Sequence, residues 1–175
     1  MIEDRIEIGL ALECRRTGGE WGGYTWRPLA VFATPPDVEP WTALGPLKDG
    51  GRWYAGSFPV ALYSTDTANY RDNLESGAPR LWVVLRPTGP EPPVEVALVT
   101  ADPAEGEGAT EAGNNVVETI AMPGEIAGVV AAFIAAHHVE RPVIKRRRDR
   151  AEPDVRWQDR PTTSAPTIAG RKDPP

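Results

Sequence analysis

The chain has 175 residues, including 19 Pro, 17 Gly and one Cys, and carries a formal net charge of −6. This length suits one domain with a sizeable core, and the high Pro and Gly content predicts many turns and short elements. The single cysteine excludes an intrachain disulfide and a Cys-based zinc cluster, which favours a reducing compartment. No apolar run approaches the roughly 20 residues that cross a bilayer, and no secretion signal is recognisable. We therefore expect a cytoplasmic protein without a membrane span.

Charge divides the chain near residue 140. Residues 1–140 contain 9 Lys and Arg against 20 Asp and Glu, whereas residues 141–175 contain 10 against 5, together with six prolines. The apolar periodicity stops at the same point, and a cationic segment without such a pattern is typical of a flexible arm. We predict a single domain over 1–140 and a basic, Pro-rich, disordered tail over 141–175.

Alternating apolar and polar residues give the clearest strand prediction, over residues 6–15. This period of two places Cys14 on the inward face, where a thiol acts as a small hydrophobe. Glycines then predict a turn over 17–24. Prolines interrupt the extended pattern at 35–40, and the other strands predicted in this half are 26–33, 52–55 and 58–63.

The second half of the body is predicted to contain two helices. One runs to Ser76 from a cap at Ser64 or Thr65, with Asp66 in its first turn. The other begins at Pro123, and its apolar stripe consists of Ile126, Val129, Val130, Phe133, Ile134 and His137. Strands are predicted at 81–86, 94–100 and 116–121, with an acidic mobile loop at 101–114. The predicted fold class is α+β, with about seven short, mostly antiparallel strands forming a sheet or open barrel with two packed helices.

The only histidines, His137 and His138, are adjacent at the end of the second helix. Neighbouring helical residues point about 100° apart, so the two rings cannot share a metal as an i, i+4 pair could. We expect one ring to pack on the apolar stripe and the other to meet the last carbonyls of the helix. No metal site is predicted.

Catalytic and nucleotide motifs are missing from the chain. The pair Gly106 and Gly108 begins a G-x-G pattern, but Glu111 stands where the third glycine belongs, and no G-x-x-x-x-G-K is present. The segment 55–59 lacks the second glycine of a nucleophile elbow. We predict no catalytic residue and no cofactor, and expect a binding protein rather than an enzyme.

Aromatic and basic side chains are the candidates for binding. The six tryptophans form either the bulk of a small β core or an exposed patch beside Arg27 or Arg71. The candidate residues for contact with a partner or ligand are Trp26, Arg27, Tyr70, Arg71, Asn73, His137, His138, Lys145, Arg146, Arg147 and Arg148.

Three roles compete for the basic cluster at 145–150. Nucleic-acid binding is disfavoured because the acidic body repels a polyanion and few aromatic residues accompany the cations. A membrane-surface role lacks an apolar face or acyl site. Docking on an acidic protein surface needs nothing further, and this role or that of a simple solubilising tail is favoured. We expect a protein partner, with the oligomeric state left open.

Six blocks of the sequence resemble a bacterial family of unknown function whose genes are often found beside those for molybdenum-dependent formate dehydrogenases. The blocks are WGGYTWRPLAVF at 21–32, PWTAL at 40–44, YAGSFPVALYSTDTANYRDNLES at 54–76, LWVVLRP at 81–87, ALVTADPAE at 97–105 and AAFIAAHHVERPVIKRRRDR at 131–150. The resemblance implies a role in assembling, sulfurating or delivering the molybdopterin-guanine dinucleotide cofactor, or an accessory subunit. Sulfur carriers for such enzymes use a cysteine pair, and this chain has only Cys14.

We therefore predict a non-catalytic accessory protein for a molybdenum-containing formate dehydrogenase, docking through an aromatic and arginine surface and the basic tail. One alternative is a pterin- or nucleotide-binding module or enzyme in cofactor maturation. In that alternative the ligand is stacked and hydrogen-bonded by Trp26, Arg27, Tyr70, Arg71 and Asn73. Nucleic-acid binding by the tail is the other alternative.

Overall fold

The computed structural model describes residues 3–17, 23–89, 93–111 and 113–139. All of them fall in a compact unit that spans residues 1–140. The tail predicted over 141–175 lies outside the described residues.

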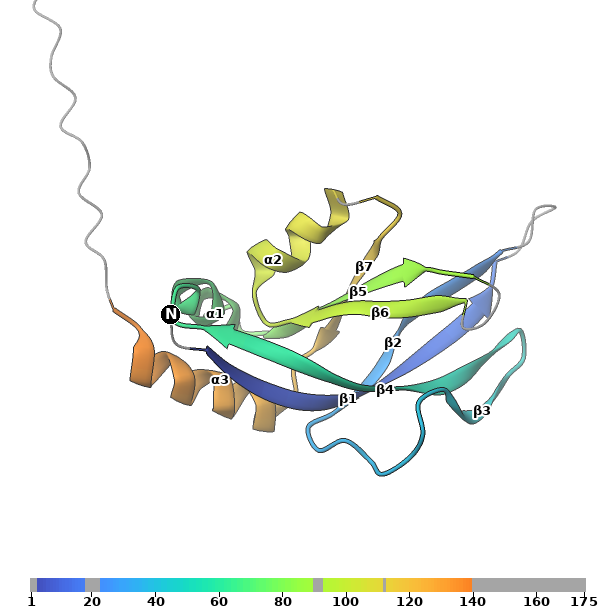
Figure 1. Cartoon of the computed structure of the whole chain (residues 1–175), viewed down its shortest axis with the longest axis horizontal. Coiled ribbons are helices and arrows are strands. Elements are labelled where there is room, and N and C mark those ends of the chain that lie inside the picture. Colours follow the sequence, from blue (N-terminus) through green and yellow to red (C-terminus); the bar gives the residue numbers. More distant parts are fainter. Residues whose placement is uncertain (1–2, 18–22, 90–92, 112, 140–175) are drawn as a thin grey trace, which may run out of the picture. The chain divides into compact units, whose positions relative to one another are not determined.

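The first four strands form one antiparallel sheet, sheet A, in the order β2-β1-β4-β3 (Figure 1). The strands are β1 (Glu3–Arg16), β2 (Tyr24–Phe32), β3 (Thr42–Leu47) and β4 (Gly50–Tyr63). The predicted β1 and β2 are confirmed. Two short strands were predicted at 52–55 and 58–63, where the structure has the single strand β4. This prediction was wrong, because β4 continues through a bulge at the register shift opposite Leu10 and Ala11. Strand β3 was not predicted, since Gly45 and Pro46 obscure its short pattern.

The remaining strands form sheet B, in the antiparallel order β6-β5-β7. Its members are β5 (Arg80–Pro87), β6 (Val94–Thr100) and β7 (Val116–Ala121), which confirms all three predicted ranges to within a residue. Contacts join β2 to β7 and β4 to β6, so the two sheets lie against each other. The predicted α+β class with mostly antiparallel strands is confirmed, with the strands divided between two sheets.

In the described part of the chain, three α-helices accompany the sheets: α1 (Thr67–Glu75), α2 (Pro103–Gly108) and α3 (Gly124–His137). Helices α1 and α3 confirm the predicted pair and contact each other (Figure 1). Helix α1 begins after Asp66 rather than after Ser64 or Thr65. Pro123 directly precedes α3, whose face toward the core carries Ile126, Val130 and Phe133.

The mobile loop predicted at 101–114 was wrong, because α2 and a 3-10 turn (Ala109–Glu111) occupy it. The side chain of Asp102 caps α2 by accepting a hydrogen bond from Ala104 N at 2.8 Å, and Pro103 follows in the first turn. Gly106 lies so close to sheet B that a Cβ there would be 2.3 Å from Trp82 Cγ. Glycine, read in the sequence as a sign of a loop, instead permits close helix packing.

One hydrophobic core joins the two sheets with α1 and α3. Its fully buried side chains include Leu10 of β1, Leu62 of β4 and Val83 of β5. Strand β1 is central in sheet A and is buried on both faces between Ile8 and Cys14. Within the described ranges, no helix combines the length and apolar character needed to cross a membrane.

Candidate functional site

An open hollow lies at the end of sheet A where β1 ends and β2 and β4 begin. Arg16 pairs with Tyr24 at this end, and Arg15 pairs with Gly50, so three strand ends meet here. The hollow has a volume of about 1020 Å³. Its lining consists of Cys14, Arg16, Tyr24, Trp26, Trp41, Lys48, Asp49, Gly50, Trp53 and Pro93.

Three partly exposed tryptophans form the aromatic wall of the hollow, which we call the tryptophan hollow. The ring centroids of Trp26 and Trp53 are 5.2 Å apart, and those of Trp26 and Trp41 are 6.0 Å apart with the planes at 89°. Strand register brings the first pair together, since Trp26 lies opposite Cys14 and Trp53 opposite Leu12. Because strand residues alternate in direction, both rings extend the inward face of sheet A beyond the end of the core.

Glycines at the start of β4 make room for this wall. A Cβ on Gly51 would lie 2.3 Å from Trp53 Cη2, and a Cβ on Gly50 would lie 1.8 Å from the carbonyl oxygen of Cys14. The ring of Trp53 therefore covers the bare backbone of Gly51. Larger residues at these positions would displace the ring or separate β4 from β1.

Trp41 has an unusual backbone conformation, with a φ of 62°. It occupies a turn that is closed by a hydrogen bond from Thr42 N to Glu39 O at 3.3 Å. Proline fixes a negative φ at position 40, so the positive φ at the next residue corresponds to a type II turn, which normally takes glycine there. A tryptophan in this position is strained, and its ring lies in the wall of the hollow.

The rest of the lining supplies one thiol and several charges. Cys14 is 3% exposed, and burial raises the pKa of its thiol, so the thiol is a poor nucleophile, in keeping with the structural role expected for it. Arg16 and Lys48 come from the end of β1 and from the β3–β4 turn, next to Asp49. The backbone of Arg16 donates to Asp49 O at 2.7 Å, which fixes the turn to β1.

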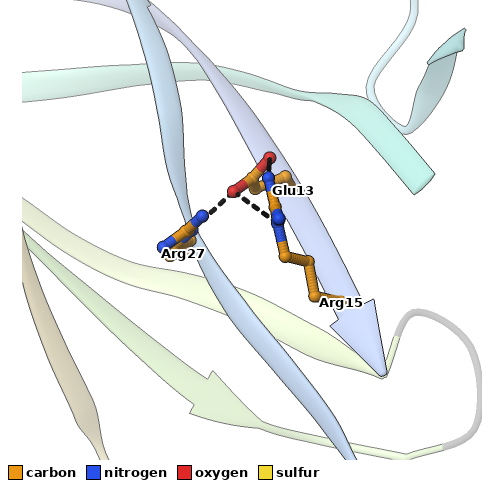
Figure 2. A network of polar contacts seen from close by, with 3 residues as sticks. All are labelled: Glu13, Arg15 and Arg27. Carbon is orange, nitrogen blue, oxygen red and sulfur yellow. Dashed lines mark hydrogen bonds and ion pairs between the residues drawn. The ribbon is translucent and has the colours of Figure 1, made fainter. Parts of the chain in front are cut away.

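The outer face of sheet A carries a buried carboxylate with two arginines (Figure 2). Glu13 is 3% exposed and accepts from Arg27 Nε at 2.5 Å and from Arg15 Nε at 3.1 Å. Burial, the largest effect, raises the pKa of Glu13, but the hydrogen bonds from Arg27 and then Arg15 together bring it below the ordinary value. Arg52 lies opposite Glu13 on the other neighbouring strand. Sequence analysis identified Arg27 and missed Glu13, which the alternation placed on a solvent face.

The predicted histidines separate at the end of α3. The ring of His137 packs on Phe133 with centroids 4.7 Å apart, on the apolar stripe as expected. His138 meets α1 rather than the last carbonyls of its own helix: its Nε2 lies 3.1 Å from Arg71 Nη1 and its Nδ1 lies 3.0 Å from Thr67 Oγ1. Because a guanidinium can only donate, the contact with Arg71 casts Nε2 as the acceptor and leaves Nδ1 to donate to Thr67 Oγ1.

Tyr70 and Asn73 lie on α1, and their buried side chains bond backbone groups of neighbouring segments. The hydroxyl of Tyr70 accepts from Tyr63 N at 3.1 Å, and burial, the main cause, raises the pKa of Tyr70 to about 12. The Asn73 side chain bonds three backbone groups, one of them the carbonyl of Ala101 at 2.9 Å.

The five residues proposed for a ligand are therefore not gathered at one place. Trp26 contacts Trp53 near the start of β4, whereas Tyr70 binds Tyr63 at its end. Ten residues of extended chain separate these two points, or roughly 30 Å. Arg27 lies next to Trp26 in the sequence but on the opposite face of the sheet.

The basic candidates Lys145, Arg146, Arg147 and Arg148 lie outside the described residues. Among the residues that the structure covers, no group of three or more His, Cys, Asp or Glu side chains could hold a metal ion.

Two facing antiparallel sheets with three helices define an α+β domain, and its sequence places it in a known family. The chain belongs to the family described as protein of unknown function (DUF3305), whose model matches residues 7–148. No curated protein and no solved structure matches the chain. The family match covers the domain and continues into the basic cluster.

Proposed function

We propose that this protein is a non-catalytic accessory factor that docks on a molybdenum-containing formate dehydrogenase or on one of its maturation factors. The choice of enzyme is supported by the resemblance of six sequence blocks to a family encoded beside such dehydrogenases. The mode of action is supported by a basic surface on the outer face of sheet A.

That surface, the arginine face, consists of Arg15, Arg27 and Arg52. Strand register and sequence spacing place all three on the same face of the sheet as Glu13, and two of them, Arg15 and Arg27, bond its carboxylate. The side chains of Arg15 and Arg27 are 57% and 51% exposed while they bond Glu13. No ion pair joins Arg52 to another described residue. The face is therefore a cationic area on a body in which acidic residues predominate.

The bonds to Glu13 support docking because they fix the arginines before a partner arrives. Ordering a long side chain on binding costs roughly 0.5–1.5 kcal/mol, and part of this cost is avoided when the guanidinium is already held. The ring of Phe32, 38% exposed, lies on the same face against Tyr54 at 6.2 Å between centroids. Arginine and aromatic side chains are the residues most enriched at interface hot spots. An acidic protein surface is the complementary partner.

Affinity purification from the native host tests the proposal. The tagged full-length chain is compared with a variant carrying Arg15→Ala and Arg52→Ala, which leaves Arg27 to bind Glu13. The matched control is Arg86→Ala, which removes an exposed arginine that pairs with Glu95 on sheet B at 2.9 Å. We expect mass spectrometry to recover formate dehydrogenase subunits or their maturation factors with the unmodified chain and the control. The double variant should recover them about tenfold less. Absence of such proteins from the unmodified sample would refute the proposal.

A second variant tests the contribution of the basic cluster in the full-length chain. It carries Lys145→Ala, Arg146→Ala, Arg147→Ala and Arg148→Ala. If the cluster steers association with an acidic surface, this variant should bind the recovered partner more slowly and with a weaker dependence on salt. Unchanged association rates at low and high salt would remove the cluster from the docking model.

A further inference from the structure

We infer that the tryptophan hollow binds a planar heteroaromatic ring that carries a phosphate group, as a mononucleotide does. The inference concerns a different surface from the arginine face and does not rest on the proposed docking role. It follows from the ring geometry, the strained turn and the charges at the hollow.

The rings offer two surfaces at a right angle. Trp26 and Trp41 meet at 89°, so a flat guest stacked on one of them meets the other edge to face. Trp53 adds a third ring 5.2 Å from Trp26. Trp26 and Trp41 pack against the core, yet all three rings remain partly exposed. Stacking on aromatic side chains suits any flat heterocycle, because every such ring has a π face.

The turn at Trp41 indicates that the aromatic wall is a specific feature. Glycine would adopt the φ of 62° without strain, whereas tryptophan adopts it at a cost. The turn is held by the bond from Trp41 N to Tyr54 O at 2.6 Å, which fixes the ring beside Trp26. Strained residues of this kind concentrate at ligand-binding positions, so the conformation supports a site here.

The charges favour an anionic group on the ring. Two cations, Arg16 and Lys48, line the hollow against one carboxylate, Asp49, and neither cation forms an ion pair with another described residue. Arginine binds phosphate oxygens in bidentate fashion, and lysine adds a compact positive charge. The volume of about 1020 Å³ lies at the upper end of the range for small-molecule pockets. A mononucleotide therefore fits, with its ring on the tryptophans and its phosphate toward the two cations.

Titration of the purified full-length protein with AMP and GMP tests the assignment. Binding is followed by isothermal calorimetry and by quenching of tryptophan fluorescence, with adenosine, guanosine and inorganic phosphate as partial ligands. We expect at least one nucleotide to saturate the protein and to bind about tenfold tighter than its nucleoside, because only the nucleotide engages the cations. The affinity should fall as salt is raised.

Variants locate the binding at the hollow. Trp41→Gly removes a ring while relaxing the turn, and should weaken binding about tenfold. Lys48→Gln lies in an exposed turn, so it carries the test if Trp41→Gly does not fold, and should reduce both affinity and salt dependence. Arg5→Gln, which removes an exposed cation at the opposite end of β1 from Arg16, is the control and should leave binding unchanged.

Three outcomes would overturn the inference. They are the absence of saturation by both nucleotides up to millimolar concentration, nucleotide affinity unchanged in Trp41→Gly and Lys48→Gln, and saturation of the hollow by a neutral proline-rich peptide instead. These results come from purified protein and small molecules alone. They leave the docking proposal, which depends on recovered proteins, to be judged separately.

Discussion

Arg27 donates from Nε to Oε1 of Glu13 at 2.5 Å, across the pairing of β1 with β2. The carboxylate is almost completely removed from solvent while the guanidinium stays half exposed. This asymmetry means that Glu13 depends on its arginine partners, whereas the arginines remain available to other molecules. One residue thus links the stability of sheet A to the composition of its outer surface.

Glu13→Gln should destabilise the fold by about 1–3 kcal/mol, because it replaces hydrogen bonds between ions of opposite charge with weaker bonds from the guanidinium groups to a neutral amide oxygen. The matched control is Glu3→Gln, which removes the exposed pair with Arg5 and should cost clearly less than Glu13→Gln, because solvent screens exposed ion pairs. Urea unfolding followed by circular dichroism gives both free energies. Equal losses in the two variants would show that burial of Glu13 adds nothing.

The same carboxylate predicts a pH dependence. Since the folded-state pKa of Glu13 lies below its unfolded value, the unfolded chain binds more protons and stability rises with pH. The contribution is present above the unfolded pKa of about 4.3 and is lost as pH falls through the folded value. The difference in unfolding free energy between the unmodified protein and Glu13→Gln should therefore shrink from pH 6 to acid conditions. A constant difference would contradict the lowered pKa.

The alternation of β1 predicted its existence and its inward face, but the role of Glu13 could not be predicted in this way. A polar residue between apolar ones ordinarily faces solvent, yet this strand is central and its second face is also covered. A Cβ on Gly9 would lie 3.1 Å from both Pro36 and Tyr54, residues that come from a loop and another strand. Which segments cover a strand depends on pairings between residues that are far apart in the sequence, and the pattern of one short segment does not contain that information.

The tryptophan hollow also could not be predicted from the local sequence pattern. Abundant tryptophan and glycine were evident, and an exposed aromatic patch was one of two predicted interpretations. The rings meet because Cys14 pairs with Trp26 and Leu12 with Trp53, which depends on two separate strand pairings. Helix α2 was missed for a related reason, since its glycine is explained by the proximity of Trp82 rather than by a loop.

The turn at Trp41 predicts an inverted order of stability between two small substitutions. Trp41→Ala and Trp41→Gly both lose the ring, but alanine keeps a Cβ in a backbone region that costs about 1 kcal/mol, which glycine avoids. The glycine variant should therefore be the more stable of the two by about that amount in thermal or urea unfolding. In ordinary positions glycine is the less stable choice, so a higher stability of the alanine variant would argue against the positive φ.

Asn73 provides the last test, because it ties α1 to the ends of β5 and β6. Its Nδ2 donates to Arg80 O at 2.8 Å and to Ala101 O at 2.9 Å, and its Oδ1 accepts from Arg80 N at 3.0 Å. Asn73→Asp keeps the shape but replaces the donor with a second acceptor, so two carbonyls face a buried carboxylate. We expect a loss of about 3 kcal/mol or more in unfolding free energy. Asn115→Asp is the control, since its Nδ2 makes one bond, to Ala109 O at 3.1 Å, at a partly buried position. Its Oδ1 accepts from Arg86 Nε at 3.4 Å, so the new carboxylate gains an ion pair and the loss should be at most about 1 kcal/mol. Similar losses in both variants would mean that Asn73 does not hold the helix to the sheet.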